Sequence, residues 1–155
     1  MATDIGNAYV GGEAKLYYNA GTYGSPTWTL MENVADVDIA DGRSAVEAPI
    51  RAQWPIVGHL PGKQNIELTF NGLKTKLTTD AVTTAMITKY EAGTVTEFAI
   101  ADAAIATTGT KYRRITAVLT KADETQPLDS PVMCAFAAVP AVNNSGNNPS
   151  RATAS

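Results

Sequence analysis

Hydrophobic and polar side chains alternate along most of the chain, which is the pattern of half-buried β-strands. The clearest example lies at 64–71, where Ile66, Leu68 and Phe70 alternate with polar residues and are expected to face a core. Runs of the same kind, bounded by turn-forming Gly, Pro, Asn and Asp, predict further strands. These lie at 13–18, 27–30, 33–40, 43–50, 94–101, 111–121 and 131–140.

A helical spacing replaces this alternation in one place. At 79–91, Val82, Met86 and Tyr90 recur every four residues, and Gly93 follows as a stop signal. Seven or eight strands with one inserted helix predict a mainly β protein. We expect an antiparallel β-sandwich or open barrel whose helix covers one side or end.

The 155 residues suit one domain, which is expected to span 13–140. Residues 1–12 are small and polar and are expected to form a flexible arm. Residues 141–155 are too polar to bury a core of their own and are expected to form a flexible tail. Within the domain, Asp41-Gly42 predicts a turn, and the Pro- and Gly-rich segment 51–63 predicts a long loop.

The composition excludes several classes of site. The net charge is −3, so no basic surface for gripping nucleic acid is expected. Cys134 is the single cysteine and His59 the single histidine, which excludes an intrachain disulfide and a Cys/His zinc site. No apolar run approaches the length of a membrane span, and the start lacks the pattern of a signal peptide. We expect no membrane partner and synthesis in a cytoplasm.

The residues that carry chemistry elsewhere are not arranged for it here. Asp36, Asp38 and Asp41 depart from the spacing of an EF-hand calcium loop. His59 has no nucleophile motif near it, and no Walker motif or dinucleotide fingerprint is present. We therefore expect no enzymatic activity, with no catalytic residue, cofactor or metal. Arg113 shares the apolar face of its strand, so it is expected to pair with a carboxylate or reach a neighbouring subunit.

The 51–63 loop carries many apolar side chains for an exposed segment. Left in water, they are an aggregation hazard, so we expect another subunit to cover them. The candidate inter-subunit contacts are Trp54, Pro55, Ile56, Val57, His59 and Leu60.

From about Glu13 to Pro140, the order of elements resembles that of the major tail tube proteins of long-tailed, siphovirus-like bacteriophages. The likeness is carried by a series of segments along the chain: Trp28–Leu30, Asn33–Ile39, the strand containing Arg43, the loop Trp54–Gly62, Ile66–Phe70, the helix 79–91, the strand 111–121, the segment Asp123–Asp129 and the apolar strand 131–140.

This resemblance implies a structural virion protein. Such proteins assemble in the host bacterial cytoplasm into hexameric rings that stack into the tail tube, the conduit through which genome DNA passes into the host. The implied partners are further copies of the chain and other tail proteins (tape measure, terminator and tail tip). DNA is expected to pass through the lumen without specific binding.

The resemblance also implies a channel wall, which should repel phosphates so that DNA is not held in transit. Strand alternation places Glu67 and Thr69 opposite the core residues of their strand. The same alternation makes Asp36 and Asp38 point the same way, opposite Val37 and Ile39. The candidate lumen-facing residues are therefore Asp36, Asp38, Glu67 and Thr69.

Two other classes of function remain open from the residues. One is a virion protein in another position, such as a tail terminator or a capsid decoration protein. The other is a monomeric cytoplasmic β-sandwich that binds a carbohydrate or other ligand in an aromatic cleft. The aromatic residues available for such a cleft are Tyr17, Tyr23, Trp28 and Trp54.

Overall fold

The computed structural model describes residues 14–49, 51, 57–74, 81–141 and 150–155. This part of the chain forms eight strands and one helix. Their bounds are β1 Lys15–Asn19, β2 Trp28–Leu30, β3 Val34–Ala48, β4 Gly58–Leu73, α1 Ala81–Ala92, β5 Val95–Ala101, β6 Lys111–Thr125, β7 Met133–Pro140 and β8 Ser150–Thr153.

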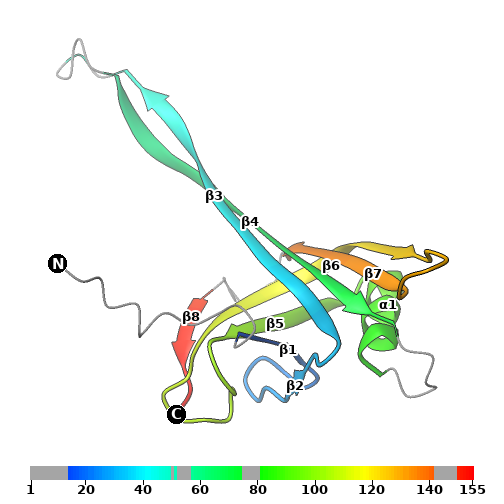
Figure 1. Ribbon diagram of the computed structural model, residues 1–155. Coiled ribbons are helices and arrows are strands. Elements are labelled where there is room, and N and C mark those ends of the chain that lie inside the picture. Colours follow the sequence, from blue (N-terminus) through cyan, green and yellow to red (C-terminus); the bar gives the residue numbers. More distant parts are fainter. Residues whose placement is uncertain (1–13, 50, 52–56, 75–80, 142–149) are drawn as a thin grey trace, which may run out of the picture.

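The strands make one curved antiparallel sheet in the order β2-β1-β5-β6-β7-β4-β3, and β8 pairs with β6 beside this path. Two strands, β3 and β4, continue past the body of the domain as a long hairpin that projects into solvent (Figure 1). The helix lies against the body near the end of β4 (Figure 1). The predicted mainly β fold with one helix is confirmed.

The core lies on one face of the sheet, beneath the helix. Phe70 is the centre of its aromatic part: its ring centroid is 5.2 Å from that of Phe136 and 5.8 Å from that of Phe98. These rings come from β4, β7 and β5, so they join strands that are distant in sequence. Met86 of α1 is fully buried in the same cluster. The alternation at 64–71 predicted this correctly, since Ile66, Leu68 and Phe70 are all buried.

Gly93 ends α1 as expected from its position. It adopts a left-handed φ of 63°, which glycine reaches without the steric cost of a side chain. Its amide donates to the carbonyl of Tyr90, and the amide of Thr94 donates to the carbonyl of Lys89 at 3.0 Å. These bonds satisfy carbonyls of the last turn, which have no partner within the helix.

The turn predicted at Asp41-Gly42 is wrong, because β3 runs without interruption from Val34 to Ala48. Asp41 pairs with Ile66 and Gly42 with Asn65 in the ladder to β4. The two segments predicted as separate strands are therefore one strand, which pairing with β4 holds extended.

The long loop predicted at 51–63 is also wrong over its second half, because β4 begins at Gly58. Its first residues pair with the end of β3, including Leu60 with Val46 and His59 with Glu47. Pro61 is tolerated here because this part of β4 has β3 as its only partner strand among the described residues, so the missing amide costs no ladder bond on a second side. Residues 52–56 lie outside the described part.

The flexible tail predicted at 141–155 contains a strand. β8 pairs with the first residues of β6, and the amide of Ala154 donates to the carbonyl of Thr110 at 2.8 Å. The tail is too polar to form a core, but strand pairing needs backbone groups rather than apolar side chains. The predicted arm at 1–12 and the segment 142–149 lie outside the described residues.

Candidate assembly surfaces

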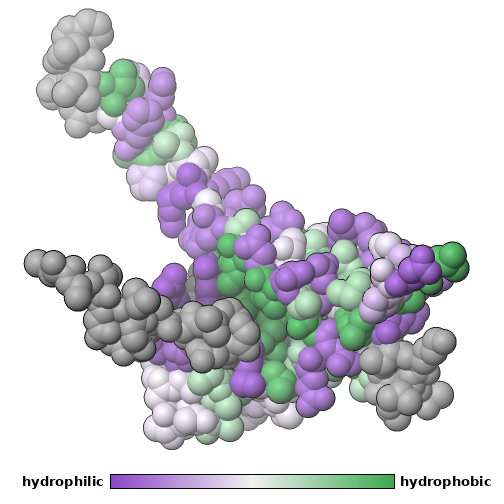
Figure 2. Space-filling model, viewed as in Figure 1, coloured by the Kyte–Doolittle hydropathy of each residue, from purple (hydrophilic) through white to green (hydrophobic). Residues whose placement is uncertain are grey.

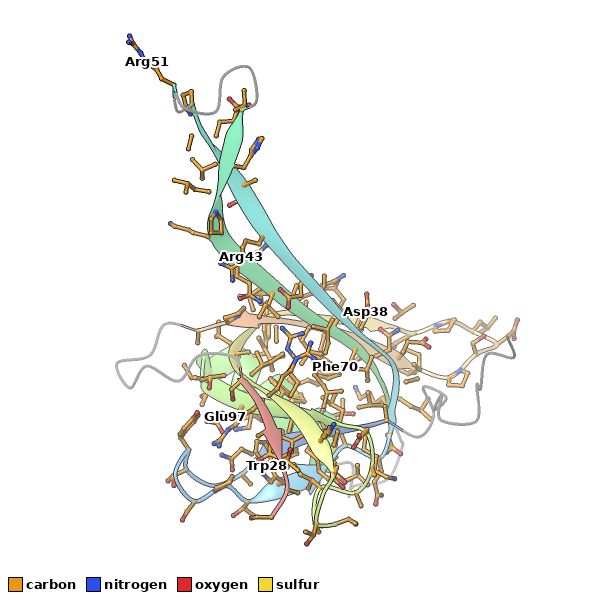
Figure 3. All side chains as sticks on the ribbon, turned by 90° about the vertical axis from the view of Figure 1, so that its left-hand side faces the viewer. Trp28, Asp38, Arg43, Arg51, Phe70 and Glu97 are labelled. Carbon is orange, nitrogen blue, oxygen red and sulfur yellow. The ribbon has the colours of Figure 1, made fainter. Side chains whose placement is uncertain are left out.

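Three of the four residues predicted to face a channel share one face of the β3–β4 pair. Asp38 lies directly opposite Thr69, and Glu67 lies opposite Ala40, two positions along. Directly paired residues of antiparallel strands project from the same face, and this face is opposite the buried Leu68. Asp38 and Glu67 are exposed and Thr69 is half-buried. Figure 3 shows Asp38 at the base of the hairpin, and Phe70 within the body.

The register extends this face across two more strands. Thr69 pairs with Ala137 of β7, and Ala137 pairs with Lys121 of β6. Asp123 follows on the same face, and its carboxylate lies 3.2 Å from the ammonium of Lys121. Sequence reasoning missed Lys121 and Asp123, because a bulge between Leu119 and Lys121 breaks the alternation that would have assigned them.

The structure does not bring Asp36 together with Asp38 in the way that alternation predicts. The ladder to β4 shifts register between Ala35 and Asp38, so one extra residue stands in β3. Asp36 has a φ of 51°, a left-handed conformation in which strand alternation does not hold. It lines a groove between β1 and β3 beside Leu16 and Val37. The argument that Asp36 and Asp38 point the same way is therefore wrong.

The far part of the β3–β4 hairpin exposes apolar side chains to solvent. No other described segment of the chain covers them. Val46 and Leu60 are directly paired, so they project from one face, and they are 54% and 57% exposed. Val57 is 47% exposed. Glu47 and His59 form the next pair and project from the other face. Of the predicted contact residues, Trp54, Pro55 and Ile56 lie outside the described part.

A polar cluster fixes the hairpin where it leaves the body. The guanidinium of Arg113 in β6 donates to the carboxylate of Asp41 in β3 at 2.6 Å, which confirms that Arg113 pairs with a carboxylate. Gln64 donates to the other oxygen of Asp41 at 2.8 Å and accepts from Arg43 at 3.2 Å. The hydrogen bond from Gln64, followed by that from Arg113, holds the pKa of Asp41 below its usual value.

A second ion pair is buried on the opposite face of the sheet from the core. Arg114 of β6 donates to the carboxylate of Glu97 of β5 through two nitrogens, at 2.6 Å and 3.1 Å. Asn19 at the end of β1 donates to the same oxygen at 2.9 Å. The guanidinium also lies 3.7 Å from the ring centroid of Tyr23 and 5.3 Å from that of Trp28. Nothing in the sequence spacing pointed to this cluster, because its members come from distant segments.

The aromatic side chains that a ligand cleft would need are in contact with other residues of the subunit. Tyr23 and Trp28 are engaged by Arg114, and Trp28 also meets the ring of Tyr112 edge to face at 6.2 Å. Tyr17 is buried, and its hydroxyl accepts from the amide of Ile105 at 3.3 Å. Trp54 lies outside the described residues. These contacts are internal to the subunit and argue against the ligand-binding interpretation.

Within the described residues, no group of three or more His, Cys, Asp or Glu side chains is placed to hold a metal ion. In that same part of the chain, no helix is long and apolar enough to span a bilayer. The two polar clusters described above are ion pairs that join strands, Asp41 with Arg113 and Glu97 with Arg114. The distinctive features are therefore surfaces: a projecting hairpin, a polar sheet face and exposed strand edges.

Solved structures with this arrangement were found, although no family model and no curated protein matches the chain. A subunit from the tail of an empty gene transfer agent (GTA) particle, refined with C6 symmetry, matches with a TM-score of 0.67 at 14% identity. The match covers 88% of this chain and 96% of that chain. A subunit of the SPP1 tail tube matches with a TM-score of 0.67 at 12% identity, covering 84% of this chain and 74% of that chain. The chain has the fold of tail tube proteins.

The tail tube fold also extends to a contractile system. The sheath/tube terminator of an extracellular contractile injection system (PVC), in its extended state, matches with a TM-score of 0.60 at 9% identity. That match covers 93% of this chain and 96% of that chain. The same fold is thus found in more than one position of such particles. At these identities the likeness establishes the fold, and the position and assembly of this chain are matters for proposal.

Proposed function

We propose that this protein is the structural subunit of a phage-type tail tube, forming hexameric rings that stack into a conduit for DNA. The observation that carries the proposal is the β3–β4 hairpin, which projects away from the body with the apolar pair Val46 and Leu60 in water. A hairpin of this length cannot cover its own apolar face. Its stability in water therefore calls for a partner, and repetition of one contact between identical copies produces rings or tubes.

The sheet supports the same proposal. β3 pairs with β4 along one side, and in the described residues its other edge has no partner strand. Open edges of this length are aggregation hazards unless another chain covers them. Joining the sheets of neighbouring copies satisfies these backbone groups and encloses a channel. The fold shared with the GTA tail and the SPP1 tail tube agrees with this assembly.

In such a tube we assign the face bearing Asp38, Glu67 and Thr69 to the lumen. Where β3, β4, β7 and the end of β6 share this face, the carboxylates of Asp38, Glu67 and Asp123 outnumber the ammonium of Lys121. Further along β6, the charge of Arg114 is paired with that of Glu97. Sixfold repetition makes the wall negative, so that DNA phosphates are repelled and pass without being held. Screening limits this field to roughly 8–10 Å from the wall at physiological salt.

The partners in this proposal are further copies of the chain, the tape measure, the terminator and the tail tip, within a virion tail that is assembled in a bacterial cytoplasm. The role is structural and not catalytic. A second candidate function, a tail terminator that forms a single ring, is favoured by the match to a sheath/tube terminator.

Electron microscopy of the purified protein separates these functions. A tail tube subunit is expected to form tubes with a regular axial repeat and sixfold symmetry. Isolated rings that do not stack would assign the terminator role instead. A protein that stays monomeric at all concentrations, under conditions in which it is folded, would contradict both.

A further inference from the structure

The turn between β6 and β7 presents the most exposed large hydrophobic side chain described in this structure. Leu128 is 99% exposed, and it follows Pro127 and precedes Asp129. Pro131 also lies in this turn, so two prolines restrict its backbone. Figure 1 shows the turn at the edge of the body, away from β8, and its tip is hydrophobic in the space-filling view (Figure 2). A rigid turn that holds a leucine in water is suited to insertion into a partner.

A cleft of about 390 Å³ lies at the other end of β6, where β5, β6 and β8 meet. The side chains of Ile100, Lys111, Arg113 and Arg151 line it from one face of the sheet, so that an apolar side chain lies beside three positive charges. An engineered cavity of roughly 150 Å³ admits a benzene molecule, so this cleft has room for a leucine side chain. The sequence did not predict this cleft, because residues 150–153, which form β8, were expected to be part of a flexible tail.

The charges of the turn and the cleft are complementary. Asp129 makes no ion pair with any described residue, and it stands next to the leucine. In the cleft, Arg113 is paired with Asp41, whereas Lys111 and Arg151 have no carboxylate within ion-pair distance in the described part of the chain. Arg151 also interacts electrostatically with Asp41, so its charge is partly offset. The carboxylate of Asp129, next to the exposed leucine, is therefore complementary to a cleft with an excess of positive charge. The Asp102 carboxylate also lines this cleft, and it accepts from the backbone amide of Lys111.

The two features cannot meet within one subunit. They are separated by the 15 residues of β6, which extend roughly 50 Å at about 3.3 Å per residue. A contact between the turn of one copy and the cleft of the next joins two different surfaces. Such a contact is propagated from copy to copy and closes only when the rotation between copies allows a ring.

We propose that the β6–β7 turn of one copy docks in the β5–β6–β8 cleft of the next, with Leu128 in the cleft and Asp129 beside Lys111 and Arg151. This inference rests on the proposed self-assembly and names one of its joints. It also gives β8 a function, since the strand supplies one wall of the cleft.

Disulfide trapping with two single variants tests this joint. Leu128→Cys and Thr153→Cys chains, carrying different tags, are co-expressed, purified and oxidised mildly; Thr153 is exposed, lines the cleft and shares a face with Lys111. The native Cys134 is buried and does not compete. We expect a disulfide-linked pair that carries both tags, and no cross-linked pair when either variant is oxidised alone. Lack of the mixed pair in assembled protein, or an equally strong pair from Leu128→Cys alone, would overturn the proposed docking.

Electron microscopy of the same samples separates this inference from the proposed function. Normal tubes without mixed cross-links contradict the joint and leave the tube role in place. Mixed cross-links without tubes or rings support the joint and contradict the tube role.

Charge exchange provides a test without cysteines. Asp129→Arg and Arg151→Asp are each expected to raise the protein concentration needed for assembly by about tenfold, a loss typical of a charged contact between subunits. The double variant is expected to recover most of this loss, because it restores opposite charges. A double variant that assembles no better than either single variant would contradict the proposed pairing.

Discussion

Asp41 and Arg113 meet at 2.6 Å across the base of the hairpin, although they are 72 positions apart in the sequence. Their contact ties β3 to β6, two strands that are not neighbours in the sheet order. The hairpin is therefore anchored by a side-chain bridge in addition to its own ladder. Gln64 donates to the same carboxylate and completes the anchor.

This anchor predicts a loss of stability in acid. Since the pKa of Asp41 is below its ordinary value of 3.8 in the folded protein, the ionised carboxylate stabilises the fold above that pH. The contribution is lost as the pH falls through the lowered value. Asp41→Asn is expected to reduce Tm at pH 7, and the difference from the wild type is expected to shrink below about pH 3.8. Thermal melts followed by circular dichroism at several pH values measure this.

The control for that series is Glu91→Gln, because Glu91 is exposed on α1 and makes no ion pair with a described residue. Its melting curve is expected to follow that of the wild type at each pH. A difference between Asp41→Asn and wild type that persists unchanged at pH 2 would show that the hairpin anchor does not depend on the charge.

The buried ion pair of Arg114 and Glu97 is expected to contribute more to stability than the more exposed pair of Asp41 and Arg113. Their side chains are 13% and 8% exposed, and Glu97→Ala leaves the guanidinium without its carboxylate. We expect a loss of about 3 kcal/mol, since removing one partner of a buried ion pair leaves an uncompensated charge. This corresponds to a decrease in Tm of roughly 6–12 °C for a domain of this size. Glu67→Ala, which removes an exposed carboxylate, is the matched control, and an equal decrease in both variants would contradict the role of the pair.

The aromatic core predicts the cost of losing Phe70. Its side chain is 1% exposed and contacts the rings of Phe98 and Phe136. Phe70→Ala is expected to lower the free energy of unfolding by about 3–5 kcal/mol, through lost burial and the cavity left behind. Leu128→Ala is the control, because a side chain that is 99% exposed contributes little to the fold. Urea denaturation of both variants measures the difference, and a small loss for Phe70→Ala would place the core elsewhere.

The elements that sequence predicted well are those governed by local pattern. Ile66, Leu68 and Phe70 are buried because a strand with one covered face alternates strictly, and Gly93 ends α1 because it reaches a left-handed φ without strain. The core face, the helix and the class of fold follow from rules that act over a few residues. These features can therefore be predicted without knowing which strands pair.

The elements that sequence missed depend on partners far away in the chain. Asp41-Gly42 has the composition of a turn, but pairing with β4 keeps it extended. The strand β8 has no apolar pattern and exists because the start of β6 offers it a free edge. Asp36 departs from alternation because of a bulge, which adds one residue to β3 and leaves no mark in the spacing. Of the four residues predicted to face the lumen, Asp38, Glu67 and Thr69 therefore share a face. Strand alternation does not assign Asp36 to that face.

A substitution on the exposed apolar face of the hairpin is expected to prevent assembly without affecting folding. Leu60→Asp places a charge on the exposed apolar face that Leu60 shares with Val46, while the ladder bonds of the backbone remain. We expect a folded protein with an unchanged melting temperature that no longer forms tubes. His59→Asp, on the other face of the same hairpin, is the control and is expected to interfere less. Normal tubes from Leu60→Asp in electron microscopy would show that this face is not a joint.

The channel wall gives the last prediction. Asp38 and Glu67 project from the face opposite the core, beside Thr69 and Ala137, so lysine at either position does not disturb the buried residues. In a sixfold ring, each exchange replaces six negative charges by six positive ones, so the wall repels phosphates less and binds them locally at the new lysines, over roughly 8–10 Å at physiological salt. We expect phage carrying either Asp38→Lys or Glu67→Lys alone to assemble normal tails and to eject DNA more slowly, with the delay disappearing as salt is raised.

Glu91→Lys provides the matched charge change on the exposed side of α1, away from the proposed lumen face, and is expected to leave ejection unchanged. The comparison is decisive because both variants add the same charge to each subunit, so a difference in rate reports position and not net charge. Ejection followed by the fluorescence of a DNA-binding dye at several salt concentrations gives both rates. Equal, salt-independent rates from fully assembled tails of the single lumen variants and of Glu91→Lys would place Asp38 and Glu67 outside the channel, because a ring of six lysines in the lumen would act on a polyanion that passes within the screening length.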